Sequence, residues 1–166
     1  MKTFKRVLAL VLAMVICLGA VNIAFAAEPT TQAPKSIKIL AIGNSFSQDA
    51  VYHLWRVAKN AGIEEVIIAN AYRSGCTLEM HWTSVAENGT EYTYERNESG
   101  TIVRTKEQSL ESILKAEDWD YITMQQGSGS SGKPDTYEPY LTNLIGWVNE
   151  NKTNPDAKLY WHTTWA

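Results

Sequence analysis

Four short apolar segments set the hydrophobic pattern of the chain. They are IKILAIG at 37–43, EEVIIANAY at 64–72, WDYITMQQ at 119–126 and AKLYWHTTWA at 157–166. Short, nearly continuous apolar runs with β-branched residues are typical of strands that are buried on both faces of a parallel sheet. We therefore predict four core strands.

Helical spacing fills the intervals between these strands. Apolar residues three and four positions apart run from Val51 to Ala58, and similar patterns lie at 110–114 and at 137–151. Strands that alternate with helices predict an α/β fold. We expect a doubly wound, three-layer α/β/α domain of flavodoxin-like type with a mainly parallel sheet.

The region from Met80 to Ser109 departs from this alternation. Its segment EYTYERNESGTIVRT (91–105) has two alternating stretches on either side of Asn97-Glu98-Ser99-Gly100. Such a pattern predicts a β-hairpin, which we interpret as an insertion at the rim of the sheet.

The first 26 residues have the features of a secretory signal peptide. A basic start precedes an apolar run that ends in Ala24-Phe25-Ala26. The run is near the lower length limit for a membrane span, so we do not expect a stable membrane anchor. We predict cleavage near Ala26, a flexible linker at 27–36 and one domain at 37–166. The protein would then be secreted or in the cell envelope of a bacterium.

Charge and cysteine content narrow the classes of partner. Removing the three basic residues of the leader from the 15 in the chain leaves 12 against 18 acidic residues, about −6 in net charge. This balance argues against nucleic acid and anionic membrane surfaces. Only Cys76 would remain after processing, so no intrachain disulfide can form. Because the histidines lack helical i, i+4 spacing and no cysteine pair is present, we expect no metal site and no cofactor.

The candidate chemistry lies where strands end. Ligands of doubly wound sheets bind at the carboxyl ends of the strands, so the turns at 43–47, 73–76 and 125–128 should gather there. Ser45 follows the first strand directly and stands at the start of a helix. It is either a helix cap or a nucleophile whose oxyanion the free N–H groups of the helix would stabilise.

The motifs at these turns resemble those of the SGNH/GDSL hydrolase superfamily. ILAIGNSFS is similar to its first block, YRSGCTLEMHW to its second, and DYITMQQGSGSSG stands in the place of its third. With HTTWA included, the resemblance is closest to a domain-of-unknown-function branch of that superfamily, and it extends from about residue 37 to the last residue. The resemblance implies that Ser45 is the nucleophile. The backbone N–H groups of Ser45 and Gly75 would then be donors of the oxyanion hole.

Two departures from the family pattern concern the remaining machinery. The third block usually carries an asparagine whose amide is a further oxyanion donor, and this chain has Gln125 and Gln126 there. Either glutamine can take the role, and we favour Gln126. Superfamily members also carry Asp-x-x-His near the carboxyl end, and this sequence has no such motif. We therefore expect 37–166 to be the front part of a longer hydrolase.

The three histidines of the chain are weaker alternatives for the catalytic base. His53 falls inside the first predicted helix, whereas His81 and His162 are candidate pocket residues together with Asn44. The function that the resemblance implies is a secreted serine esterase that acts on a small-molecule or glycan ester, for example in O-deacetylation. Two alternatives stay open: a non-catalytic carbohydrate-binding module of the same fold, and a truncated, inactive fragment.

Overall fold

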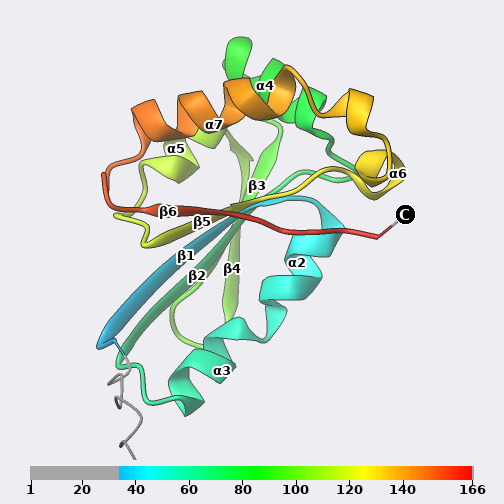
Figure 1. The fold of residues 1–166 in the computed structure, drawn as a ribbon. Coiled ribbons are helices and arrows are strands. Elements are labelled where there is room, and N and C mark those ends of the chain that lie inside the picture. The colour runs from blue at the N-terminus through cyan, green and yellow to red at the C-terminus, as the bar shows by residue number, and fades with distance from the viewer. Residues whose placement is uncertain (1–33, 166) are drawn as a thin grey trace, which may run out of the picture. The chain divides into compact units, whose positions relative to one another are not determined.

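The computed structural model describes residues 34–165, and these residues form an α/β domain with a six-stranded sheet (Figure 1). The predicted signal peptide and residues 27–33 of the predicted linker lie outside the described residues. The strands follow the order β4-β3-β2-β1-β5-β6. The three-layer α/β/α prediction is confirmed.

Four parallel strands form the centre and one side of the sheet. They are β1 (Ser36–Gly43), β2 (Glu65–Tyr72), β5 (Tyr121–Met124) and β6 (Lys158–Trp161). β1 pairs in parallel with β2 on one side and with β5 on the other. The chain therefore reverses its direction of travel across the sheet at the carboxyl end of β1, where α/β sheets bind their ligands.

The predicted hairpin forms the opposite edge of this sheet. β3 (Tyr92–Asn97) pairs antiparallel with β2, and β4 (Ile102–Gln108) pairs antiparallel with β3. On β3, Tyr92 pairs with Gln108 of β4 and Tyr94 pairs with Thr105. The β3 residues are two positions apart and their partners three, so β4 carries one extra residue between these pairs, which is a β-bulge. The bulge coincides with Glu107, whose φ is 58°.

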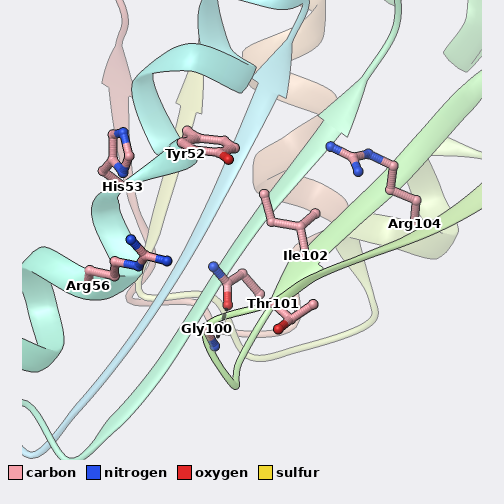
Figure 2. Close-up of a pocket in the computed structure, with 8 residues that line it drawn as sticks. Tyr52, His53, Arg56, Gly100, Thr101, Ile102 and Arg104 are labelled. Carbon is pink, nitrogen blue, oxygen red and sulfur yellow. Dashed lines mark hydrogen bonds between the residues drawn. The ribbon is translucent and has the colours of Figure 1, made fainter.

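Two helices cover one face of the sheet. The expected single helix is in fact two, α2 (Ser45–Tyr52) and α3 (Leu54–Asn60), separated at His53. The C-terminal turn of α2 and the start of α3 lie opposite the hairpin, with Tyr52, His53 and Arg56 across from Ile102 and Arg104 (Figure 2). The ring of Trp55, on α3, lies under the hairpin turn at Gly100 and so fills part of the space between α3 and the hairpin.

The other helices lie on the opposite face of the sheet (Figure 1). They are α4 (Leu78–Ala86), α5 (Leu110–Leu114) and α7 (Tyr140–Asn151), and the loop after β5 adds the short α6 (Ser128–Ser131) and a 3-10 turn at Pro134–Thr136. α4 was not expected from the sequence. Among the described residues, no helix has the length and apolar character that a membrane crossing needs.

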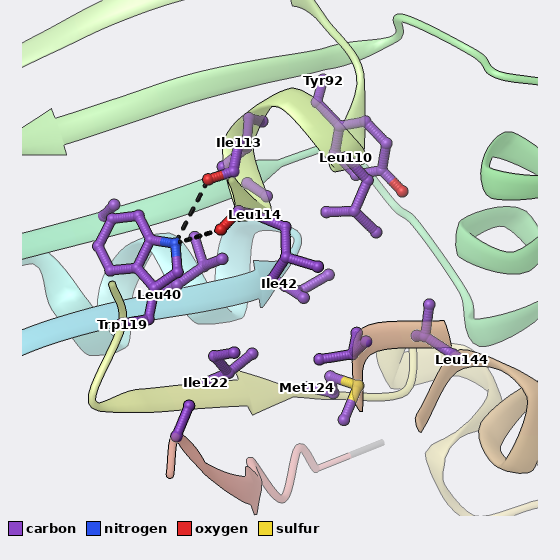
Figure 3. Close-up of a cluster of buried hydrophobic side chains, with 14 of the residues drawn as sticks. Leu40, Ile42, Tyr92, Leu110, Ile113, Leu114, Trp119, Ile122, Met124 and Leu144 are labelled. Carbon is purple, nitrogen blue, oxygen red and sulfur yellow. Dashed lines mark hydrogen bonds between the residues drawn. The ribbon is translucent and has the colours of Figure 1, made fainter. Parts of the chain in front are cut away.

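The larger core fills the space between this helical layer and the sheet (Figure 3). Leu40 and Ile122 on neighbouring strands are fully buried against Leu114 and Leu144. Trp119 closes one end of the core, and its indole N–H donates to the carbonyl of Leu114 at 3.0 Å. This bond satisfies a carbonyl at the end of α5 that has no partner within the helix. The core thereby fixes where β5 begins and where its carboxyl end emerges.

Candidate functional site at the end of the first strand

Ser45 stands at the junction between β1 and α2. It is the first residue of the helix, it is exposed, and Asn44 before it is the N-cap. The Asn44 side-chain oxygen accepts a hydrogen bond from the Phe46 backbone N–H at 3.0 Å. Because Asn44 provides the side-chain cap, the hydroxyl of Ser45 is left free of that role.

Asn44 also ties the three turns together from a buried position. Its amide donates to the backbone carbonyl of Cys76 at 3.1 Å, and its Oδ1 accepts from Nε2 of Gln125 at 2.7 Å. Cys76 follows β2 and Gln125 follows β5. One buried side chain thus holds the ends of β1, β2 and β5 in fixed positions around Ser45.

A pocket of about 190 Å³ opens at this junction. Its walls come from the three expected turns, and its lining residues are Asn44, Ser45, Phe46, Gly75, Thr77, Gly127, Ser128, Gly129 and Ser130. The gathering of three distant segments follows from the parallel strands, whose carboxyl ends meet at one edge of the sheet. The pocket is polar and mostly lined by small residues, so backbone groups are accessible in it.

Two backbone N–H groups at this pocket have no acceptor in the described part of the chain. Gly75 has φ of 61° inside a turn closed by the Cys76 N–H and the Arg73 carbonyl at 3.2 Å. The N–H of Ser45 belongs to the first turn of α2, where no intrahelical acceptor exists. Free N–H groups at a helix start attract developing negative charge.

The two glutamines occupy structural positions behind the pocket. Gln126 accepts through Oε1 from the N–H groups of Leu78 at 3.0 Å and Gly127 at 2.9 Å. Its amide nitrogen donates to the carbonyl of Thr136 at 3.1 Å. Since that donor is occupied and neither glutamine lines the pocket, the geometry does not support Gln126 or Gln125 as the expected oxyanion donor.

Gln125 is fully buried and leaves one atom without a partner. Its Oε1 accepts no hydrogen bond from residues 34–165, whereas its Nε2 donates to Asn44. A Cβ on Gly43 would lie 2.6 Å from this oxygen and 2.7 Å from the hydroxyl oxygen of Ser47. Glycine at position 43 therefore makes room for the buried amide that supports Asn44.

The candidate pocket histidines lie elsewhere. His81 is buried in α4, where its Nδ1 lies 2.8 Å from the hydroxyl of Tyr92. Burial, together with the charge of Arg73, lowers the pKa of His81 to about 3, so it is neutral near pH 7. His162 follows β6 and gives its backbone N–H to the Met124 carbonyl at 2.8 Å. His53 is exposed between α2 and α3. No histidine or acidic residue lines this pocket among the described residues.

Cys76 is inert although it adjoins the pocket turn. The side chain is fully buried, and burial raises the pKa of its thiol to about 12. A thiol is nucleophilic only as a thiolate, so Cys76 packs as a small apolar residue. Across residues 34–165, no three His, Cys, Asp or Glu side chains come close enough together to hold a metal ion.

Comparison with known proteins places the chain in a family. The family model described as "Domain of unknown function (DUF4886)" matches residues 38–166. The chain belongs to the DUF4886 family. No curated protein matches it in sequence.

A solved DUF4886 structure has the same fold. The crystal structure of a DUF4886 family protein from Bacteroides uniformis ATCC 8492 is 39% identical, with a TM-score of 0.75. The match covers 79% of this chain and 51% of the other. This DUF4886 chain therefore spans about half the length of that relative.

Sequence reasoning had missed one part of this DUF4886 pocket. The expected turn ended at residue 128, but Ser128–Ser131 form a helical turn, and Gly129 and Ser130 also line the pocket. The N–H of Ser130 bonds to the Gly127 carbonyl at 2.9 Å, which holds the turn closed. The clustered serines were the only signal in the sequence, because short polar turns carry no hydrophobic periodicity.

Proposed function

We propose that this DUF4886 chain carries the acyl-binding half of an SGNH-type ester hydrolase with Ser45 as its nucleophile. The observation that supports the proposal is the exposed Ser45 hydroxyl in a pocket shared with Gly75. Because Asn44 already caps α2, the interpretation of Ser45 as the side-chain cap loses its support. The resemblance of ILAIGNSFS to the first SGNH block supports the same role.

The proposed reaction is acyl transfer in two steps. The Ser45 hydroxyl oxygen attacks the ester carbonyl carbon, its proton goes to a base, and the alcohol leaves after accepting a proton. Water then hydrolyses the acyl-serine, which releases the carboxylic acid and restores the hydroxyl. The N–H groups of Ser45 and Gly75 would bind the oxyanion in both steps. The resemblance assigns the base to an Asp-x-x-His pair, and no residue of that kind lines the pocket in the described part of the chain.

The substrate that fits this proposal is a small acyl ester, with an O-acetylated glycan as the class we favour. The pocket of about 190 Å³ has room for a short acyl group, and its small lining residues would let backbone donors reach the substrate. The leader-like first 26 residues support an exported protein that meets such glycans outside the cytoplasm.

The test uses an activated ester, p-nitrophenyl acetate, whose leaving group needs no general acid. Hydrolysis is compared among the chain, Ser45→Ala and the control Ser74→Ala, which removes an exposed hydroxyl at the neighbouring turn. Acetylation of the peptide that contains Ser45 is followed by mass spectrometry. We expect turnover and acetylation to be lost only in Ser45→Ala. Equal rates for Ser45→Ala and the unmodified chain would refute the role of Ser45 as the nucleophile.

A second candidate is a carbohydrate-binding module, and an aromatic pair favours it. Phe46 lines the pocket, and the ring of Trp165 meets it edge-on with centroids 4.7 Å apart. Trp165 is 69% exposed, so most of its surface is available for stacking on a sugar ring. Saturable binding of an acetylated oligosaccharide, lost in Trp165→Ala but kept in Ser45→Ala without turnover in either, would support this alternative.

A further inference from the structure

A second pocket lies away from Ser45, between the α2–α3 junction and the β3–β4 hairpin. It has a volume of about 390 Å³. Its lining residues are Tyr52, His53, Arg56, Asn97, Gly100, Thr101, Ile102 and Arg104, of which seven are labelled in Figure 2. It shares no lining residue with the Ser45 pocket.

The charge of this pocket is opposite to that of the whole protein. The chain has a formal net charge of −3, yet the pocket lining includes two arginines and no acidic residue. Arg56 comes from α3 and Arg104 from β4, so the two guanidinium groups approach from opposite walls (Figure 2). Like charges facing one space repel each other unless an anion lies between them.

Both arginines have N–H groups that no acceptor among the described residues occupies. Arg56 forms no salt bridge within residues 34–165. Among the described residues, the only hydrogen bond of the Arg104 side chain runs from Nε to Oε1 of Glu95 at 2.7 Å. This bond fixes the plane of the guanidinium group and leaves both terminal nitrogens unused. Arginine forks with free terminal nitrogens match the oxygen atoms of carboxylate, sulfate and phosphate groups.

The pocket lining also includes a polar residue that is mostly buried. Asn97 is 7% exposed, and its Oδ1 accepts from the Gly100 N–H at 2.8 Å. Its amide nitrogen has no acceptor in the described part of the chain, but it is not fully buried. It is therefore free to donate to an oxyanion bound in the pocket. At the rim, Tyr52 is 54% exposed and offers a flat aromatic face and a hydroxyl.

We infer that this pocket is a binding site for an oxyanion group, held between Arg56 and Arg104 over the Asn97 amide. The shared chemistry is a carboxylate, sulfate or phosphate group, either as a free ion or attached to a sugar. The hairpin presents Arg104 and Asn97, whereas the helical side presents Arg56. Binding would therefore join two elements that are far apart in the sequence.

The experiment measures binding by isothermal titration calorimetry with the chain itself. Inorganic sulfate and glucuronate are the two probes, and glucose is the uncharged comparison. The variants are Arg56→Gln and the control Lys106→Gln, which removes the same charge from an exposed position on β4. Arg56 has no ion pair to lose, so its removal should leave the fold intact; a thermal melt of each variant checks this.

We expect saturable binding of both anions, weakened about tenfold or more in Arg56→Gln and little changed in Lys106→Gln. Tighter binding of glucuronate than of sulfate would identify an anionic sugar as the ligand class, and equal or tighter binding of sulfate would identify a free oxyanion. Absence of saturable binding, or equal losses in both variants, would overturn the inference. Ser45→Ala should bind both anions as the unmodified chain does, so failure of the esterase proposal leaves this result unaffected.

Discussion

Nε2 of Gln125 donates a 2.7 Å hydrogen bond to Oδ1 of Asn44, and this bond joins the end of β5 to the start of α2. The same Asn44 side chain caps α2 and bonds to the Cys76 carbonyl. The position of Ser45 therefore depends on the hydrogen bonds of the side chain directly before it. The first prediction concerns this junction.

Replacing Asn44 with alanine should destabilise the domain by about 2 to 4 kcal/mol. The change removes an N-cap, which contributes about 1 kcal/mol, and leaves the Gln125 amide and the Cys76 carbonyl buried without partners. Urea unfolding followed by circular dichroism measures the effect. Asn60→Ala, at the exposed end of α3, is the matched control and should change stability by less than about 0.5 kcal/mol. Similar losses in the two variants would contradict the structural role of Asn44.

Gly43→Ala should also be destabilising, by about 1 to 3 kcal/mol, because overpacking forces neighbours from their positions. The added methyl group would lie 2.6 Å from Gln125 Oε1 and 2.7 Å from Ser47 Oγ. Gly146→Ala in α7 is the control, since no atom lies within 4 Å of its added Cβ. That variant should gain up to about 1 kcal/mol from helix propensity. Opposite signs for the two changes, measured as thermal midpoints, are the expected result.

The neutral His81 predicts an acid-sensitive fold. Its pKa is lowered to about 3 by burial and by Arg73, whereas an unfolded histidine titrates near 6.5. Between these values the unfolded chain binds a proton that the folded chain does not. Stability should therefore fall as the pH drops below 6.5, by about 1.4 kcal/mol per pH unit from this group.

The variant that tests this is His81→Gln, which can still bond to the Tyr92 hydroxyl. Between pH 6.5 and pH 5, its free energy of unfolding should decline less than that of the unmodified chain. His53→Gln, which removes an exposed histidine, is the control variant. Identical profiles for His81→Gln and the unmodified chain would show that His81 is charged in the folded state.

Cys76 should resist alkylation while the domain is folded. Its pKa is raised to about 12 by burial, so little thiolate is present at pH 8 and the sulfur is inaccessible. Iodoacetamide should modify the peptide that contains Cys76 at least about a hundredfold faster in urea than in buffer, because unfolding restores both access and an ordinary pKa. Comparable rates in the two conditions, followed by peptide mass spectrometry, would contradict the buried position.

The sequence was most informative where hydrophobic periodicity is strong. Leu40 and Ile122 lie in apolar runs that predicted β1 and β5, and the alternating residues around Asn97 predicted the hairpin. α4 escaped prediction because two of its buried positions are occupied by His81 and Ser84, which break the apolar stripe. Polar residues in a core are satisfied by partners distant in the sequence, and no local pattern announces those partners.

The same limit explains which parts of the candidate site could be predicted from the sequence. The turn carrying Ser45 was predictable because strand ends meet at one edge of a parallel sheet. The orientation of Gln126 was not, since it is set by Leu78 and Thr136, one on α4 and the other in the loop after α6. The break at His53 was equally hidden, because the apolar spacing continues across it from Val51 to Ala58.

The bulged edge of the sheet has a consequence for how these molecules behave at high concentration. β4 exposes Arg104, Lys106 and Glu107 along its length, and the left-handed Glu107 interrupts its row of backbone donors and acceptors. Charges and irregular backbone on an outer strand prevent a neighbouring molecule from adding its own strand in register. This side of the domain is therefore protected against edge-to-edge polymerisation and amyloid-like stacking.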